Sequence, residues 1–236
     1  MSRRCATADS RLSAAATQSG YSRPLPECID VLTFYTHPLS RARVARWMLE
    51  ETGLPYEEVV LDFDTTMKSP EYLAINPMGK VPAIRHGDVV VTENAAICAY
   101  LAELVPEKAL APPPGSPERA AYYRWLFFFA GPFESWLTAR QAGVFVAARS
   151  AGYGRGDDVL ATVEQAVSGR THLAGDRFTA VDLYVAAYLG YQMMVGELER
   201  RPALEAFVAA HAQRPAALAA NARDDALAAQ LQMPGH

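Results

Sequence analysis

Apolar residues near the start of the sequence form short continuous runs, separated by a stretch with helical spacing. Residues 29–35 are β-branched, apolar and aromatic, which predicts a buried strand. Residues 39–52 follow Pro38, alternate apolar and charged side chains with helical spacing, and stop at Gly53. Residues 56–61 form a second strand-like run. A strand, a helix and a strand in this order predict a parallel pair of strands.

The next stretch predicts a short helix, a hairpin and a longer helix. Residues 69–75 are helical in pattern, and residues 81–85 and 88–91 flank a His-Gly turn. The triplet Thr-Glu-Asn at residues 92–94 opens the longer helix. Its apolar side chains recur at i, i+3, i+4 and i+7: Ile97, Tyr100, Leu101 and Leu104. The order is therefore βαβ, a helix, then ββα.

Everything after the proline-rich segment APPPGS at residues 111–116 is helical in pattern. The predicted helices cover residues 118–129, 157–167, 181–192, 203–211 and 215–229. Thr179 and Asp182 have the spacing of a capping box. In such a box the Thr179 side chain accepts from the backbone N–H of residue 182, and the Asp182 side chain accepts from the backbone N–H of residue 179. Such a box predicts a firmly fixed helix start.

These patterns predict a thioredoxin-like α/β domain over residues 29–107, a linker over 108–116 and an α-helical bundle over 117–225. Residues 226–236 are predicted to be a tail. Residues 1–28 are rich in Ser, Ala and Arg and have no apolar periodicity, which predicts a disordered extension. An organelle-targeting peptide is the alternative for this segment, because its composition is basic and poor in acids.

Composition excludes several classes of protein. The 236 residues carry a net charge of -4, without the basic excess that nucleic-acid binding requires. We expect no membrane association, because no apolar run approaches the about 18 residues of a membrane span. The three cysteines are sparse, which indicates a reducing compartment and predicts a cytoplasmic protein. The five histidines lack metal-ligand spacing, so no metal site is expected.

Four segments together resemble the cytosolic glutathione S-transferases of bacterial type. They are YTHPLSRARVARW with the following MLEETGLPY (35–56), NPMGKVPAI (76–84), TENAAI (92–97) and FTAVDL (178–183). The resemblance covers residues 29–220. It implies a thioredoxin-like domain followed by a helical bundle, a homodimer, and a detoxifying transferase. Glutathione would be the cosubstrate, and its thiol would attack a small hydrophobic electrophile or reduce a peroxide.

The resemblance also implies a glutathione site. Val81 would precede a cis Pro82, and its backbone would pair with the cysteinyl residue of glutathione. Glu93 would meet the ligand's ammonium, beside a helix N-terminus that attracts the γ-glutamyl carboxylate. Asn94 stands where the family usually has Ser, and its side chain can still offer an N–H to this carboxylate. Lys80 would pair with the glycyl carboxylate, with a solvated surface lysine as the alternative.

Thiol activation requires a group that stabilises the thiolate, because a free cysteine thiol has a pKa of about 8.5. Three hydroxyls are candidates: Tyr35, Thr36 and Ser40. Ser40 is favoured, since it matches the position where bacterial members carry a catalytic Cys or Ser; a capping role is its alternative. Tyr35 matches the tyrosine-type classes when aligned on Trp47, and Thr36 is the weakest match. No cysteine lies in residues 30–97, which excludes the cysteine-type thiol oxidoreductases.

The second substrate is expected between the two domains. The first helix of the bundle is aromatic, and we expect Phe129 and Phe133 to line an apolar pocket there, while its other aromatic residues serve the core and dimer packing. Two other functions remain open. One is a glutathione-dependent isomerase or dehalogenase. The other is a non-enzymatic adaptor that keeps the fold, as in the stringent starvation proteins, although an adaptor would not need Val81, Pro82 and Glu93.

Overall fold

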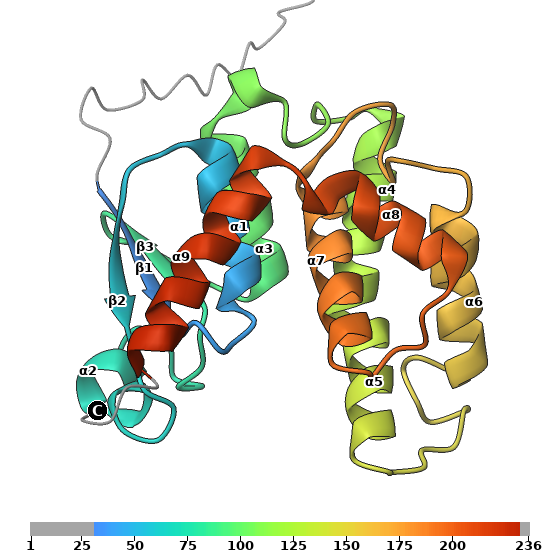
Figure 1. The fold of residues 1–236 in the computed structure, drawn as a ribbon, viewed down its shortest axis with the longest axis horizontal. Helices are drawn as coiled ribbons and strands as arrows, with labels where there is room; N and C mark the ends of the chain where they lie inside the picture. The colour runs from blue at the N-terminus through green and yellow to red at the C-terminus, as the bar shows by residue number, and fades with distance from the viewer. Residues whose placement is uncertain (1–30, 232–236) are drawn as a thin grey trace, which may run out of the picture.

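Four short strands and three helices build the first lobe of the computed structural model, which describes residues 31–231 (Figure 1). The elements are β1 Leu32–Thr36, α1 Ala42–Thr52, β2 Tyr56–Val60, α2 Pro70–Leu73, β3 Ala83–His86, β4 Val89–Thr92 and α3 Asn94–Leu104. Single 3-10 turns lie at Thr66–Lys68 and Pro106–Lys108. The predictions for residues 1–28 lie outside the described residues.

The sheet has the order β2-β1-β3-β4. β1 and β2 are parallel, with Leu32 opposite Tyr56, as the strand–helix–strand pattern predicts. β3 runs antiparallel to both β1 and β4, which confirms the predicted hairpin. The helix α1 begins at Ala42 rather than at residue 39, because the backbone N–H of Ser40 first closes a turn on the carbonyl of His37 (3.1 Å).

The two faces of the sheet are covered by different helices. Phe34 of β1 is buried on the α1 side, where the Arg46 guanidinium lies 5.2 Å from its ring centroid. The next residue, Tyr35, points to the opposite face, and its ring centroid lies 5.5 Å from that of Tyr72 on α2. This alternation is the ordinary two-residue period of a strand. It places neighbouring residues of β1 in two different environments.

The second lobe consists of helices (Figure 1). They are α4 Pro117–Phe128, a π-helical turn at Phe129–Phe133, α5 Glu134–Gln141, α6 Gly156–Val167, α7 Ala180–Met194, α8 Pro202–Ala212 and α9 Pro215–Leu231. The sequence predicts five of these helices to within two residues at each end. It does not predict α5, because Gly131 and Pro132 indicate a break there, whereas the π-helical turn carries the chain through Pro132.

The last helix, α9, leaves the helical lobe and lies along α1 of the first lobe (Figure 1). Arg46 of α1 donates to Asp224 of α9 at 2.8 Å, and both side chains are buried. α9 also extends to Leu231, so the predicted boundary at 225 and the predicted tail from 226 are wrong for residues 226–231. The alanine-rich segment favours helix, and Ala228 is buried.

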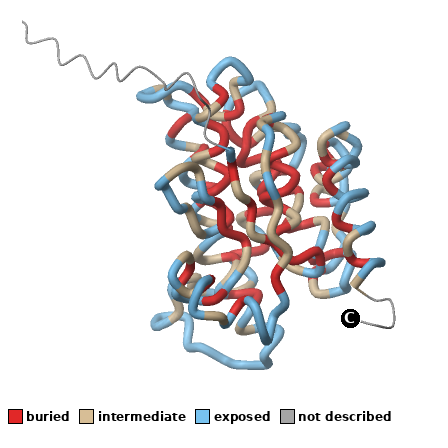
Figure 2. Tube along the Cα trace, turned by 90° about the vertical axis from the view of Figure 1, so that its left-hand side faces the viewer, coloured by how far each residue is buried: buried red, intermediate tan, exposed pale blue. Residues whose placement is uncertain are grey.

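One cluster of buried apolar side chains runs from the sheet to the outer helices. It includes Leu32 of β1, Leu101 of α3, Tyr122 of α4 and Phe207 of α8. Figure 2 shows these buried segments gathered through the interior, with exposed positions on the outer turns and loops. The two lobes therefore share a continuous core. Among residues 31–231, none of the helices is long and apolar enough to cross a membrane.

Candidate active site

Ser40 lies in the turn that opens α1. Its Oγ accepts a hydrogen bond from the backbone N–H of Ala42 (3.1 Å) and donates one to the carbonyl of His37 (2.7 Å). The side chain is half-buried. The hydroxyl therefore stabilises the turn in this structure, and a thiolate would have to compete with the His37 carbonyl for its proton. The helix N-terminus beside it favours negative charge.

The two other candidate hydroxyls lie on opposite faces of β1. Tyr35 is half-buried against Tyr72 on the α2 side. Thr36 is fully buried, and its Oγ1 has no hydrogen-bond partner among the described residues. Ser40 is the candidate that stands at the first turn of α1.

His37 shapes the same loop. Its Nδ1 accepts from the backbone N–H of Leu39 (3.2 Å), and its ring centroid lies 4.1 Å from that of Phe63. Burial lowers the pKa of His37, and the nearby Asp62 carboxylate opposes this shift. The imidazole is therefore neutral at neutral pH, with Nδ1 as an acceptor. It holds the loop before Ser40 in place.

The Val81–Pro82 peptide bond is cis, as predicted. The segment before it is fixed by two bonds to the carbonyl of Lys80, one from the hydroxyl of Tyr72 (2.6 Å) and one from Nδ2 of Asn76 (2.8 Å). The Lys80 side chain is exposed, so its pairing with a glycyl carboxylate stays a prediction. Backbone and buried side chains thus hold Val81 in place two residues before β3 begins.

Gly79 in this segment admits no other residue. Its φ is +57°, and a Cβ atom there would lie 2.7 Å from the carbonyl oxygen of Met67. Only glycine avoids both the left-handed strain and this contact. The ammonium of Lys68 donates to the Gly79 carbonyl (2.8 Å), which closes the loop against the 3-10 turn.

Glu93 and Asn94 form the start of α3. Glu93 is exposed and has φ 69° and ψ 121°, a conformation that costs a non-glycine residue about 1–3 kcal/mol. Asn94 is 8% exposed, and its Nδ2 donates to the carbonyl of Arg41 (2.9 Å). One of its N–H groups thus links α3 to the turn before α1, and the donation from this side chain to a ligand carboxylate stays a prediction. The backbone N–H groups of the α3 N-terminus still suit an anion.

Arg41 directly follows Ser40 and reaches the other lobe. Its guanidinium forms an ion pair with Glu134 at the start of α5. The hydroxyls of Tyr184 and Tyr188 on α7 lie near enough for the Arg41 charge to oppose the rise that burial causes in their pKa values. No sequence pattern indicates this cluster, because Gly131 and Pro132 indicate a break where the chain continues into the helix that carries Glu134.

Phe129 and Phe133, predicted to line a second-substrate pocket, lie in the core. Both are fully buried, and their rings stack with centroids 4.5 Å apart. Neither presents surface to a substrate in this conformation, so the structure gives that expectation no support. Tyr191 and Val195 are exposed apolar side chains near the end of α7. With Tyr184 and Tyr188 they share one helical face, at i, i+4, i+7 and i+11.

One group of side chains has metal-ligand composition. His172, Asp182 and His211 each bring one ligand atom to within 4.8 Å of the others. The Asp182 carboxylate, however, accepts from the backbone N–H groups of Leu173 and Thr179 (2.7 and 2.8 Å). These bonds fix the start of α7 and explain the carboxylate without a metal ion.

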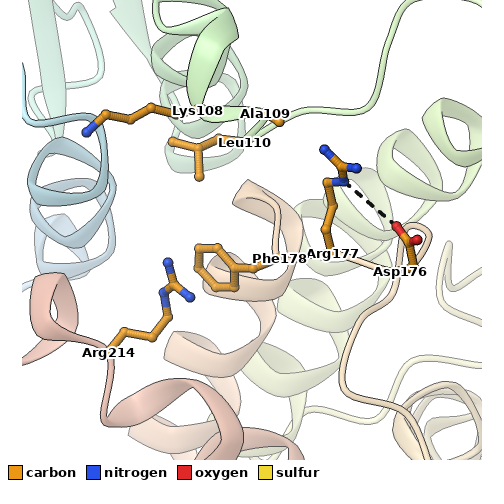
Figure 3. Close-up of a pocket in the computed structure, with 7 residues that line it drawn as sticks. All are labelled: Lys108, Ala109, Leu110, Asp176, Arg177, Phe178 and Arg214. Carbon is orange, nitrogen blue, oxygen red and sulfur yellow. Dashed lines mark ion pairs between the residues drawn. The ribbon is translucent and has the colours of Figure 1, made fainter.

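A separate hollow of about 390 Å³ lies where the chain passes between the lobes (Figure 3). It is lined by Lys108, Ala109, Leu110, Asp176, Arg177, Phe178 and Arg214. Arg214 is bound through two hydrogen bonds to Glu51 (2.6 and 2.9 Å) near the C-terminal end of α1. Ser40 stands before the N-terminal end of that helix, so this hollow is not the predicted glutathione site.

A thioredoxin-like sheet with a cis-proline segment, joined to a helical lobe, defines a two-domain protein of thioredoxin-like class. The model of the glutathione S-transferase N-terminal domain matches residues 30–103, and that of the C-terminal domain matches residues 154–215. The chain therefore belongs to the glutathione S-transferase family, and both domains of that family are present.

Individual relatives agree with this assignment. A glutathione S-transferase of Xanthomonas campestris, GST-4.5, is 30% identical over 185 residues, 75% of this chain and 90% of that protein. The solved glutathione transferase of Methylococcus capsulatus has a TM-score of 0.71 and 29% identity, covering 83% of this chain and 100% of that one. A sphingomonad glutathione S-transferase, solved in complex with glutathione, has a TM-score of 0.67 and 29% identity over 82% and 98% of the two chains.

Proposed function

We propose that the protein binds glutathione and directs its thiolate onto the electrophilic carbon of a small hydrophobic substrate. The observation that carries this proposal is the hydrogen bond from Asn94 to the carbonyl of Arg41 (2.9 Å). It holds the N-terminus of α3, which suits the γ-glutamyl end of glutathione, against the N-terminus of α1, which suits the thiol. Family membership and a sphingomonad relative bound to glutathione support the same ligand.

The binding roles follow the chemistry of the tripeptide. The backbone of Val81, before cis Pro82, pairs with the cysteinyl residue in the manner of an added strand. Glu93 meets the ammonium group, and the free backbone N–H groups of the α3 N-terminus meet the γ-glutamyl carboxylate. Lys80 is exposed beside this segment and pairs with the glycyl carboxylate.

Ser40 is the proposed thiol-activating hydroxyl. On binding, its proton turns from the His37 carbonyl to the glutathione sulfur, and the N-terminus of α1 adds its favourable potential. Both effects stabilise the thiolate and lower the pKa of the bound thiol. Tyr35 is the alternative hydroxyl, although it packs against α2.

The test measures glutathione binding by calorimetry and then the ultraviolet absorbance of bound thiolate against pH. Ser40→Ala should raise the pKa of the bound thiol toward the free value of about 8.5 and lower the conjugation rate. Ser116→Ala is the matched control, because Ser116 caps α4 through the N–H of Arg119 (3.3 Å) in the same way. If Ser40→Ala changes neither quantity while Tyr35→Phe abolishes activity, Tyr35 has the role.

The rival functions give different outcomes. An isomerase or dehalogenase would bind glutathione equally well but act on other members of a panel of electrophiles, and peroxide reduction would appear as a side activity on that panel. An adaptor would show no binding at millimolar glutathione, which would refute the proposal.

Detoxification in the cytoplasm is the setting we propose for the transferase, in line with the sparse cysteines and the buried, unpaired Cys98.

We also propose a homodimer. Tyr123 and Phe127 of α4 are exposed, and Phe127 is 70% exposed. They lie one helical turn apart, with ring centroids separated by 6.3 Å. An exposed aromatic stripe on a helix is the kind of surface that a second copy buries.

A further inference from the structure

The structure points to a substrate class for the proposed site. We propose that Arg41 binds the carboxylate of an acidic aromatic electrophile, which takes the place of Glu134 on the guanidinium. This inference rests on the proposed transferase function and narrows its second substrate. It assigns a specificity role to two residues that the sequence motifs leave unexplained.

The position of Arg41 is the first argument. The residue directly follows Ser40, and its side chain is 53% exposed while it pairs with Glu134 of the other lobe, which is 26% exposed. The next two arginines along the chain point elsewhere, because Arg43 pairs with Asp225 and Arg46 with Asp224, both on α9. Arg41 thus brings a cation to the boundary between the lobes, next to the proposed thiol-activating residue.

Exchange of the partner is the second argument. A partly exposed ion pair contributes only about 0–1 kcal/mol, so loss of Glu134 as a partner costs little. An incoming carboxylate can accept two parallel hydrogen bonds from a guanidinium, the strongest geometry that arginine offers. Glu134 therefore pairs with the Arg41 guanidinium in the free enzyme, and the carboxylate of a bound substrate replaces it.

The surroundings of Arg41 indicate an aromatic body for this substrate. Tyr184 and Tyr188 lie within electrostatic reach of the guanidinium, and their rings pack with centroids 4.8 Å apart. Tyr191 continues the same face of α7 toward solvent and is 46% exposed. Tyr184 and Tyr188 are buried (1% and 6% exposed), so the part of this face open to a substrate is Tyr191, whose ring a substrate ring next to the carboxylate would meet.

Two electrophiles that differ by one carboxylate test the inference: 2-chloro-1,3-dinitrobenzene and 4-chloro-3,5-dinitrobenzoate. With both, the sulfur forms a C–S bond, the C–Cl bond breaks, chloride leaves and the thiol proton passes to solvent. The measured quantity is the ratio of kcat/KM for the acid to that for the neutral compound. Arg41→Gln should lower this ratio about tenfold, and Glu134→Gln should raise it.

Two further variants make the result specific. Arg41→Lys keeps the charge but not the paired donors, so its ratio should fall between those of wild type and Arg41→Gln. Arg200→Gln is the matched control, because Arg200 pairs with Glu205 on the surface at 2.8 Å and its loss removes the same charge. This control should leave the ratio unchanged. Melting curves confirm that each variant is folded.

Three outcomes would overturn the inference. An equal loss with both electrophiles in Arg41→Gln would place Arg41 in thiol activation. A raised KM for glutathione with an unchanged ratio would make it a glutathione contact. If wild type conjugates both electrophiles but neither Arg41→Gln nor Glu134→Gln changes the ratio of kcat/KM, the specificity role is refuted and the proposed transferase function stands. If wild type conjugates neither compound and binds no glutathione, the proposed function fails first.

Discussion

Glu93 combines an unfavourable backbone conformation with a proposed ligand contact. Its φ of 69° suits glycine better than glutamate, so Glu93→Gly should raise the free energy of unfolding by about 1 kcal/mol. The same change removes a charge-assisted contact and should weaken glutathione binding by about 1.5–3 kcal/mol. Denaturant titration and calorimetry measure the two effects.

Ala109 provides the control for this prediction. It is the other non-glycine residue with positive φ (51°) among those the structure describes, and it lies beyond α3, outside the proposed glutathione site. Ala109→Gly should stabilise the protein similarly and leave the dissociation constant unchanged. Loss of stability in Glu93→Gly would contradict the idea that the conformation is retained for binding.

Residue identity predicts some of the site and misses the rest. The cis bond before Pro82 follows from the motif at residues 76–84, which resembles the family's cis-proline segment. The role of Asn94 does not follow, since its side chain has donors and an acceptor, and only the position of the Arg41 carbonyl decides which is used. The partner of Arg41 depends on a helix 93 residues further along the chain, so no local pattern indicates it.

At the scale of elements, the capping box of α7 carries a stability prediction. The Asp182 carboxylate accepts from the backbone N–H groups of Leu173 and Thr179 and from the Thr179 hydroxyl (2.7, 2.8 and 3.1 Å), and it is fully buried. Asp182→Ala leaves these donors unpaired and should lower the free energy of unfolding by about 1–2 kcal/mol or slightly more.

Denaturant titration measures this change, and calorimetry on the folded protein should give an unchanged glutathione affinity. The box lies far along the chain from Ser40 and Glu93, so its role is in folding. Intact stability together with lost turnover in Asp182→Ala would instead place the carboxylate in the active site.

A helix or strand is predictable from the sequence where a single pattern, such as apolar periodicity or a cap, determines it. β1, β2 and the helix α7 follow from periodicity and caps, because their apolar side chains pack into the buried clusters on the two faces of the sheet and in the helical lobe. The passage from α4 to α5 does not, since Pro132 would break an α-helix and is accommodated only by the wider π-helical turn at Phe129–Phe133. The start of α1 shifts to Ala42 because the Ser40 turn comes first.

The whole molecule is held together partly by α9, whose adjacent aspartates give a matched comparison. Asp224 is fully buried against Arg46, which keeps Glu58 as a second partner (2.6 Å). Asp224→Ala leaves a buried cation only partly paired and should cost about 3 kcal/mol in the free energy of unfolding. Asp225→Ala breaks only the exposed pair with Arg43 and should cost less than about 1 kcal/mol. Equal costs in urea titrations would contradict this account of α9.

The proposed homodimer gives a second prediction at this scale. Phe127→Glu places a charge in the aromatic stripe of α4 and should convert the dimer to a monomer, as measured by light scattering at fixed concentration. Phe145→Glu is the control, because Phe145 is 91% exposed on the loop after α5, outside the stripe. A monomeric wild type, or a dimer that tolerates Phe127→Glu, would refute the proposal.

The two-lobe organisation could be predicted from the sequence, but the place of α9 could not. The proline-rich segment at residues 111–116 marks one passage between the lobes clearly. The return at Arg214 has no comparable signal, because α9 is as alanine-rich as a bundle helix. Its ion pairs join residues about 180 positions apart, a separation at which sequence pattern carries no information.

The course of α9 makes the first lobe a discontinuous domain with the other lobe as an insert. The insert leaves near Leu110 and returns at Arg214, and both residues line the same small hollow (Figure 3). The two ends of the insert lie close together. The first lobe therefore need not change its shape to accommodate the insert, as is also true for a long surface loop. During synthesis on the ribosome, however, the helix that covers α1 emerges after every element of the insert. The lobe that is made first is therefore completed last.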